Sequence, residues 1–208
     1  MGLDRIRAFL FDMDGTLVDS DASVVRAWVA WAGRYEVDPA LAISQAHGRP
    51  AEATVRWLRP DLDDDQVVEA AAYQLAMQYD DLDDVVPTAG AHRLIEALDE
   101  RRLGWAVVTS ADRRLATARL EAAALSPRVL ITIEDVVVGK PNPESYLLAA
   151  RRLGVSPPRC LVVEDTETGL AAARAAGAMT AALKGLEADL YLDDLDALAD
   201  LVEALPLT

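Results

Sequence analysis

The stretch "RAFLFDMDGTLVDS" (residues 7–20) joins an apolar run to two aspartates that stand one residue apart. Asp12 and Asp14 follow the run directly, and Gly15 comes next. An apolar run with few charges is typical of a buried strand in a parallel sheet. Two carboxylates at the end of one strand repel each other, so the pattern favours a site that holds a cation and performs acid–base chemistry.

Short apolar runs recur along the chain and alternate with helical patterns. The runs predict buried strands at residues 6–12, 104–110, 128–133, 160–165 and 178–183. The helical patterns lie at residues 89–102, 112–124, 143–153, 167–176 and 193–205. Because strand and helix alternate, the sequence predicts an α/β fold with a parallel sheet and helices on both of its faces.

One segment breaks this alternation. Between the first strand and residue 86 only helical patterns occur, near residues 20–34, 39–46, 51–59 and 64–80. A block of this size predicts an all-helical insertion. We therefore expect a core domain of residues 1–16 plus 87–208 and an inserted helical domain of residues 17–86.

Charge and composition exclude several classes of partner. The 208 residues carry a formal net charge of −15, from 35 acidic and 20 basic residues, which disfavours nucleic acid and anionic membrane surfaces. No apolar run approaches the roughly 20 residues of a transmembrane helix, and the N-terminus lacks a signal-peptide pattern. Cys160 is the single cysteine, so no intramolecular disulfide is expected and a reducing cytoplasm fits.

Polar side chains follow each of four predicted strands. They are Asp12 and Asp14 after the first, Thr109 and Ser110 after the second, Lys140 after the third, and Glu164 and Asp165 after the fourth. In an open α/β sheet, ligands bind at the carboxyl ends of the strands, so these side chains are expected to meet at one edge.

That set of side chains suits the transfer of a phosphoryl group. The carboxylates form an oxygen-only cluster, which favours Mg²⁺. Lys140 supplies a positive charge, and Thr109 and Ser110 supply hydroxyls and main-chain N–H groups at a predicted helix start. With these groups around one phosphate, Asp12 is the expected nucleophile and Asp14 the acid that protonates the leaving alcohol and later the base that activates water.

Four motifs together resemble the haloacid dehalogenase-like hydrolase superfamily. They are "FDMDGTLVDS" (11–20), "VVTS" (107–110), "GKPNPESY" (139–146) and "VVEDTETGLAAARAAGA" (162–178). The resemblance implies a Rossmann-like, doubly wound parallel sheet core with an inserted all-helical cap domain. It gives Asp12 and Asp14 the same two roles.

The resemblance also implies a set of phosphate and metal ligands. Thr109 and Lys140 would hold the phosphate. Asp12, the main-chain carbonyl of Asp14 and Asp165 would bind Mg²⁺, with Glu164 close to or among the ligands.

Within that superfamily the chain is most similar to bacterial sugar-phosphate and polyol-phosphate phosphatases, through "DGTLVDS…VVRAW" and "HGRP". The implied substrate is therefore a small phosphorylated metabolite. A monomer is expected, because the cap of such an enzyme must open and close. In the loop "QAHGRP" (45–50), His47 and Arg49 are candidates to bind sugar hydroxyls or phosphate.

Three alternatives to a phosphatase are less favoured by the sequence. Dehalogenating members lack the second aspartate, which is present here as Asp14. Phosphosugar mutases of the β-phosphoglucomutase type carry a histidine where this chain has Val24, so a mutase is the less favoured enzyme. A non-catalytic phospho-acceptor or binding module is the remaining alternative, since an aspartate at a strand end also serves phosphorelay receivers.

An aromatic stripe runs through the first inserted helix. Val24, Trp28, Trp31 and Tyr35 recur at helical spacing. Packing inside the inserted domain is favoured over stacking on a sugar.

Overall fold

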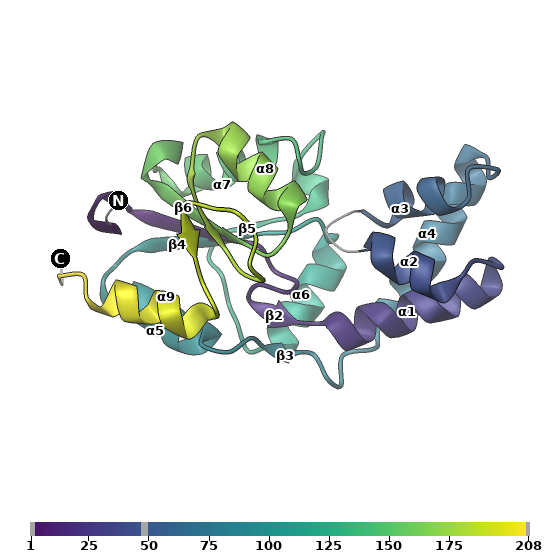
Figure 1. The fold of residues 1–208 in the computed structure, drawn as a ribbon, viewed down its shortest axis with the longest axis horizontal. Helices are drawn as coiled ribbons and strands as arrows, with labels where there is room; N and C mark the ends of the chain where they lie inside the picture. Colours follow the sequence, from purple (N-terminus) through teal and green to yellow (C-terminus); the bar gives the residue numbers. More distant parts are fainter. Residues whose placement is uncertain (1–2, 47–49, 207–208) are drawn as a thin grey trace.

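The computed structural model describes residues 3–46 and 50–206, and a six-stranded sheet lies at the centre of the larger part (Figure 1). Its strands lie in the order β5-β4-β1-β6-β7-β8, and every neighbouring pair is parallel. Their bounds are β1 Ala8–Phe11, β4 Gly104–Val108, β5 Leu130–Ile131, β6 Cys160–Glu164, β7 Met179–Ala182 and β8 Leu190–Tyr191. The chain builds outward from β1 to β5, then returns beside β1 as β6. That reversal is the switch point at which open α/β sheets bind ligands.

Helices cover both faces of the sheet, which confirms the predicted fold class. Side chains alternate along β1, so Phe9 and Phe11 pack in one apolar cluster and Ala8 and Leu10 in another. The first cluster includes side chains of α5 (Ala91–Glu100), α6 (Arg113–Ala122) and α9 (Leu195–Glu203). The second includes side chains of α7 (Glu144–Leu153) and α8 (Glu167–Ala176).

The helices α1 to α4, which the structure describes between β2 and β3, are called the helical segment below. They are α1 Asp21–Arg34, α2 Pro39–Ala46, α3 Ala51–Leu58 and α4 Asp64–Tyr79. Figure 1 shows them beside the carboxyl end of the sheet rather than on either face. They enclose an apolar cluster of their own. Trp31 lies at its centre, packs against Trp28 and Tyr35, and donates from Nε1 to the carbonyl of Ala70 at 3.0 Å, which confirms the predicted packing role for Trp31 and Tyr35.

A short antiparallel pair joins the helical segment to the rest of the chain. β2 (Val18–Asp19) pairs with β3 (Val86–Pro87). Neither strand is predicted from the sequence, because two residues are too short for a period-2 pattern. In the described part of the chain, 3₁₀ turns lie at Leu3–Arg5, Ile133–Asp135 and Pro157–Arg159. Among the helices of the described residues, none has the length and apolarity needed to cross a membrane.

Candidate active site

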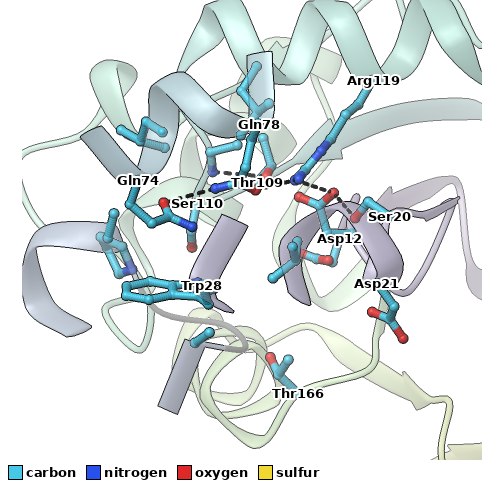
Figure 2. A pocket seen from close by; sticks show the side chains of 18 of the residues that line it. Asp12, Ser20, Asp21, Trp28, Gln74, Gln78, Thr109, Ser110, Arg119 and Thr166 are labelled. Carbon is cyan, nitrogen blue, oxygen red and sulfur yellow. Dashed lines mark hydrogen bonds and ion pairs between the residues drawn. The ribbon is translucent and has the colours of Figure 1, made fainter. Parts of the chain in front are cut away.

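A pocket of about 810 Å³, measured with its open mouth, lies between the carboxyl ends of the strands and the helical segment (Figure 2). Its floor carries Asp12, Asp14, Thr109, Lys140 and Asp165, and Ser110 lies beside them. Opposite them the wall comes from α1 and α4. The structure therefore brings the polar ends of β1, β4 and β6 to one place, as the parallel topology requires.

Lys140 occupies the centre of the floor, where it is buried. Its Nζ donates to Oδ1 of Asp12 at 2.6 Å, to Oε1 of Glu164 at 2.6 Å and to the carbonyl of Val108 at 3.0 Å. Burial disfavours the charged amine, but the two carboxylates outweigh it and hold the pKa of Lys140 above its usual range. A fixed positive charge therefore stands against one oxygen of Asp12.

Glu164 is fully buried and both of its oxygens are used within the protein. Besides Lys140, Oε1 accepts from the hydroxyl of Tyr146 at 2.7 Å. Oε2 accepts from the main-chain N–H groups of Asp165 and Thr166, both at 3.2 Å, and from the Thr166 hydroxyl at 2.9 Å. A carboxylate with this many donors is fixed in position, and Lys140 is one of the groups that it contacts.

Three carboxylates lie close enough together to share a cation. Asp12, Glu164 and Asp165 each offer an oxygen, and these oxygens lie within 4.8 Å of one another. Burial raises the pKa of Asp12 well above its usual range and raises that of Asp165 as well, despite the ion pairs each makes with a lysine. A bound cation would offset this cost of burying negative charge. The oxygen-only donors fit a hard divalent cation such as Mg²⁺.

Gly15 allows the chain to turn tightly beside this cluster. Its φ of +83° lies in the left-handed region, and a Cβ there would overlap the carboxylate of Asp165. The same carboxylate accepts from Nζ of Lys184 at 2.8 Å and from the Thr16 hydroxyl at 3.4 Å. Lys184 is thus a second cation at the site, beyond the one that the motifs indicated.

Asp14 lines the pocket and is held through one oxygen. Its Oδ1 accepts from the hydroxyl of Ser20 at 2.7 Å and from Nη1 of Arg119 at 2.7 Å. Arg119 is buried on α6, and the motifs did not point to it. Its signal in the sequence is its position one helical turn after Leu115 on the apolar face of that helix, where a charged residue needs a partner.

Thr109 and Ser110 reach the pocket just before the start of α6. Thr109 donates its N–H to the carbonyl of Ile131 at 2.9 Å. Its hydroxyl accepts from the Ala111 N–H at 3.0 Å. Helix α6 begins after Asp112, close to the predicted start, and the Asp112 carboxylate accepts from the Leu115 N–H. The main-chain N–H of Thr109 is therefore used within the sheet, and the phosphate-binding role of Ser110 stays a prediction.

The wall of the helical segment adds groups of two kinds. Val24 and Trp28 supply apolar surface, and Gln74 and Gln78 supply amides. Neither glutamine was predicted, since nothing in the sequence marks two glutamines of a polar helix as buried. His47 and Arg49, which the sequence indicated as ligands in this region, lie outside the described residues.

Comparisons with known proteins agree with the architecture. A model of the haloacid dehalogenase-like hydrolase family matches residues 6–177. Hexitol phosphatase A of Escherichia coli is 33% identical over 205 residues, covering 98% of this chain and 95% of the relative. 2-Deoxyglucose-6-phosphate phosphatase 1 of Saccharomyces cerevisiae is 33% identical over 191 residues, covering 82% of this chain and 77% of the relative. The crystal structure of a hydrolase from Pseudomonas syringae superposes with a TM-score of 0.85 at 27% identity, covering 96% of this chain and 100% of that one.

Proposed function

Since the chain belongs to the haloacid dehalogenase-like hydrolases and is a phosphatase, we propose that it hydrolyses a small sugar or polyol phosphate through a phosphorylated Asp12. The observation that carries the proposal is the contact of Lys140 with Asp12 inside a buried acidic cluster. A nucleophile, a fixed cation and metal ligands in one pocket are what transfer of a phosphoryl group requires.

The first half of the proposed reaction forms a covalent intermediate. Lys140 holds Asp12 through Oδ1, and we assign attack on phosphorus to Oδ2. The new Oδ2–P bond forms as the bond from phosphorus to the ester oxygen breaks, and Asp14 gives its proton to that oxygen. In the described residues Ser20 and Arg119 contact Oδ1 of Asp14, so we assign the proton to Oδ2.

The second half restores the enzyme. Asp14 takes a proton from a water molecule, whose oxygen bonds to phosphorus while the Oδ2–P bond to Asp12 breaks, and inorganic phosphate leaves. Mg²⁺, bound by Asp12, Asp165 and the main-chain carbonyl of Asp14, would neutralise charge on the phosphate in both halves. We assign Glu164 to holding Lys140 rather than to the metal, because both of its oxygens are already used.

We propose that residues 17–86, which include the helical segment, form a separate domain and that this domain acts as a cap. It closes the pocket opposite the catalytic floor, so it keeps bulk water out and limits the size of the substrate. We further propose that the protein works in the cytoplasm as a monomer. A free metabolite suits its strong negative charge better than a polyanionic partner.

The direct test is release of inorganic phosphate from hexose, pentose and polyol phosphates in the presence of Mg²⁺. We expect release that disappears with EDTA and in Asp12→Asn, and that persists in Asp80→Asn, the same change at an exposed position outside the pocket. Conversion of one sugar phosphate into an isomer without free phosphate would instead support a mutase. A stable phosphorylated Asp12 without turnover would support a phospho-acceptor.

A further inference from the structure

A continuous chain of hydrogen bonds runs from the proposed acid into the helical segment. Arg119 donates from Nη1 to Asp14 and from Nη2 to Oε1 of Gln78 at 2.5 Å. Gln78 donates in turn from Nε2 to Oε1 of Gln74 at 2.9 Å. Figure 2 shows these side chains following one another along one wall of the pocket. The chain thus links α6 of the core to α4 of the helical segment.

The donor–acceptor direction of this chain is fixed at its start. A guanidinium has no acceptor, so Gln78 must turn its oxygen to Arg119 and its nitrogen away. That nitrogen needs an acceptor, so Gln74 must turn its own oxygen to Gln78. Nε2 of Gln74 is consequently left at the end of the chain as a donor.

This terminal donor has no acceptor among the residues that the structure describes. Gln74 is 1% exposed and lines the pocket, and its Nε2 has no hydrogen-bond partner in residues 3–46 and 50–206. A buried amide N–H without an acceptor costs about 1–3 kcal/mol. A ligand that brings an oxygen to this atom recovers that free energy, whereas an apolar ligand does not.

We propose that Gln74 is a specificity residue that donates a hydrogen bond from Nε2 to a hydroxyl oxygen of a polyhydroxylated phosphate ester. The inference rests on the proposed function for the identity of the ligand as a phosphate ester. Trp28, on the same pocket, supplies an apolar face against the carbon skeleton of that ligand. The chain from Arg119 makes the selection directional, because it presents a donor and not an acceptor to the ligand.

The test separates the hydroxyl groups of a ligand from its phosphate. Sorbitol 6-phosphate and n-hexyl phosphate have the same carbon chain length, but only the first carries hydroxyls. Binding of both is measured by calorimetry with Mg²⁺ in the Asp12→Asn background, where turnover is blocked. Adding Gln74→Met should raise the dissociation constant of sorbitol 6-phosphate about tenfold and change that of n-hexyl phosphate by less than about twofold.

Gln66→Met serves as the matched control, since Gln66 also lies on α4 but caps its start away from the pocket. It should leave the ratio of the two affinities unchanged. If Gln74→Met does not fold, Gln74→Asn is used, because it shortens the side chain and keeps an amide. It should weaken the binding of sorbitol 6-phosphate relative to that of n-hexyl phosphate. Equal weakening of both ligands, or no weakening of either, would overturn the role of Gln74. A wild-type chain that binds sorbitol 6-phosphate in this selective way but releases no phosphate would overturn the phosphatase reaction and leave Gln74 in place.

Discussion

Replacing Glu164 by glutamine tests whether the buried anchor of Lys140 is as important as its contacts indicate. Five donors converge on the two oxygens of Glu164, and the side chain is fully buried. A glutamine has one acceptor oxygen and one N–H₂ group. If the oxygen faces Lys140 and Tyr146, the N–H₂ group faces the main-chain N–H groups of Asp165 and Thr166. If the amide is turned over, the N–H₂ group faces Lys140, which can only donate.

Either orientation leaves buried donors without an acceptor and Lys140 with one carboxylate fewer. Removing one partner of a buried ion pair costs about 3–5 kcal/mol. For a domain of this size, 1 kcal/mol lowers the melting temperature by about 2–4 °C, so Glu164→Gln should melt roughly 6–20 °C below the wild type. The measurement is thermal unfolding followed by far-ultraviolet circular dichroism, with urea unfolding for the free energy.

The matched control is Glu167→Gln, the same change three residues along the chain, where the side chain is 64% exposed. It should move the free energy of unfolding by less than about 0.5 kcal/mol. A Glu164→Gln variant that melts within about 2 °C of the wild type would refute the reasoning, because it would show that the five contacts contribute no net stability.

A glycine beside Glu164, the buried cysteine and the carboxylate cluster each allow one more test. A Cβ at Gly169 would overlap the carboxylate of Glu164, so Gly169→Ala should lower the free energy of unfolding in urea by more than about 1 kcal/mol. Gly33 is exposed in α1 and a Cβ there would have nothing within 4 Å, so Gly33→Ala should raise the same free energy by about 0.5–1 kcal/mol. Equal effects of the two substitutions would contradict this prediction. Burial raises the pKa of the Cys160 thiol to about 11, so the thiol stays protonated at pH 8. Ellman's reagent should therefore not react with Cys160 in the folded chain and should react with it after unfolding in guanidinium. Rapid reaction with the folded chain would contradict the burial of this thiol. Mg²⁺ at 100 times its dissociation constant should stabilise the folded chain by about 2.7 kcal/mol and raise its melting temperature by roughly 5–10 °C. Asp165→Asn should remove most of this increase in melting temperature, because Asp165 belongs to the carboxylate cluster. An equal increase in the variant would show that the metal binds elsewhere.

The sequence predicted the sheet and the helices because the patterns that define them are local. The apolar run of residues 160–165 became β6 at Cys160–Glu164, and the pattern at residues 167–176 became α8 over the same residues. The floor of the pocket was predictable as well, because parallel strands place their carboxyl ends at one edge of the sheet. Asp12, Lys140 and Asp165 therefore met as expected.

The wall of the pocket was not predictable in the same way. Gln74 and Gln78 lie on a helix with little amphipathic pattern, and their burial depends on how α4 packs against α1 and α6. Arg119 left a weak signal as a charge on an apolar helix face, but its partner Asp14 is far away in the sequence. Such contacts depend on tertiary packing, which period and spacing do not encode.

In the proposed reaction Asp12 forms a covalent phosphoryl intermediate whose hydrolysis depends on Asp14. p-Nitrophenyl phosphate has a leaving group that departs without an acid, so its reaction with the Asp14→Asn variant isolates the second half of the reaction. Rapid mixing with Mg²⁺ should give a burst of about one p-nitrophenolate per chain followed by a slow steady state, and Asp12→Asn should give no burst. Turnover of Asp14→Asn at the wild-type rate without a burst, or a burst that survives in Asp12→Asn, would contradict the account.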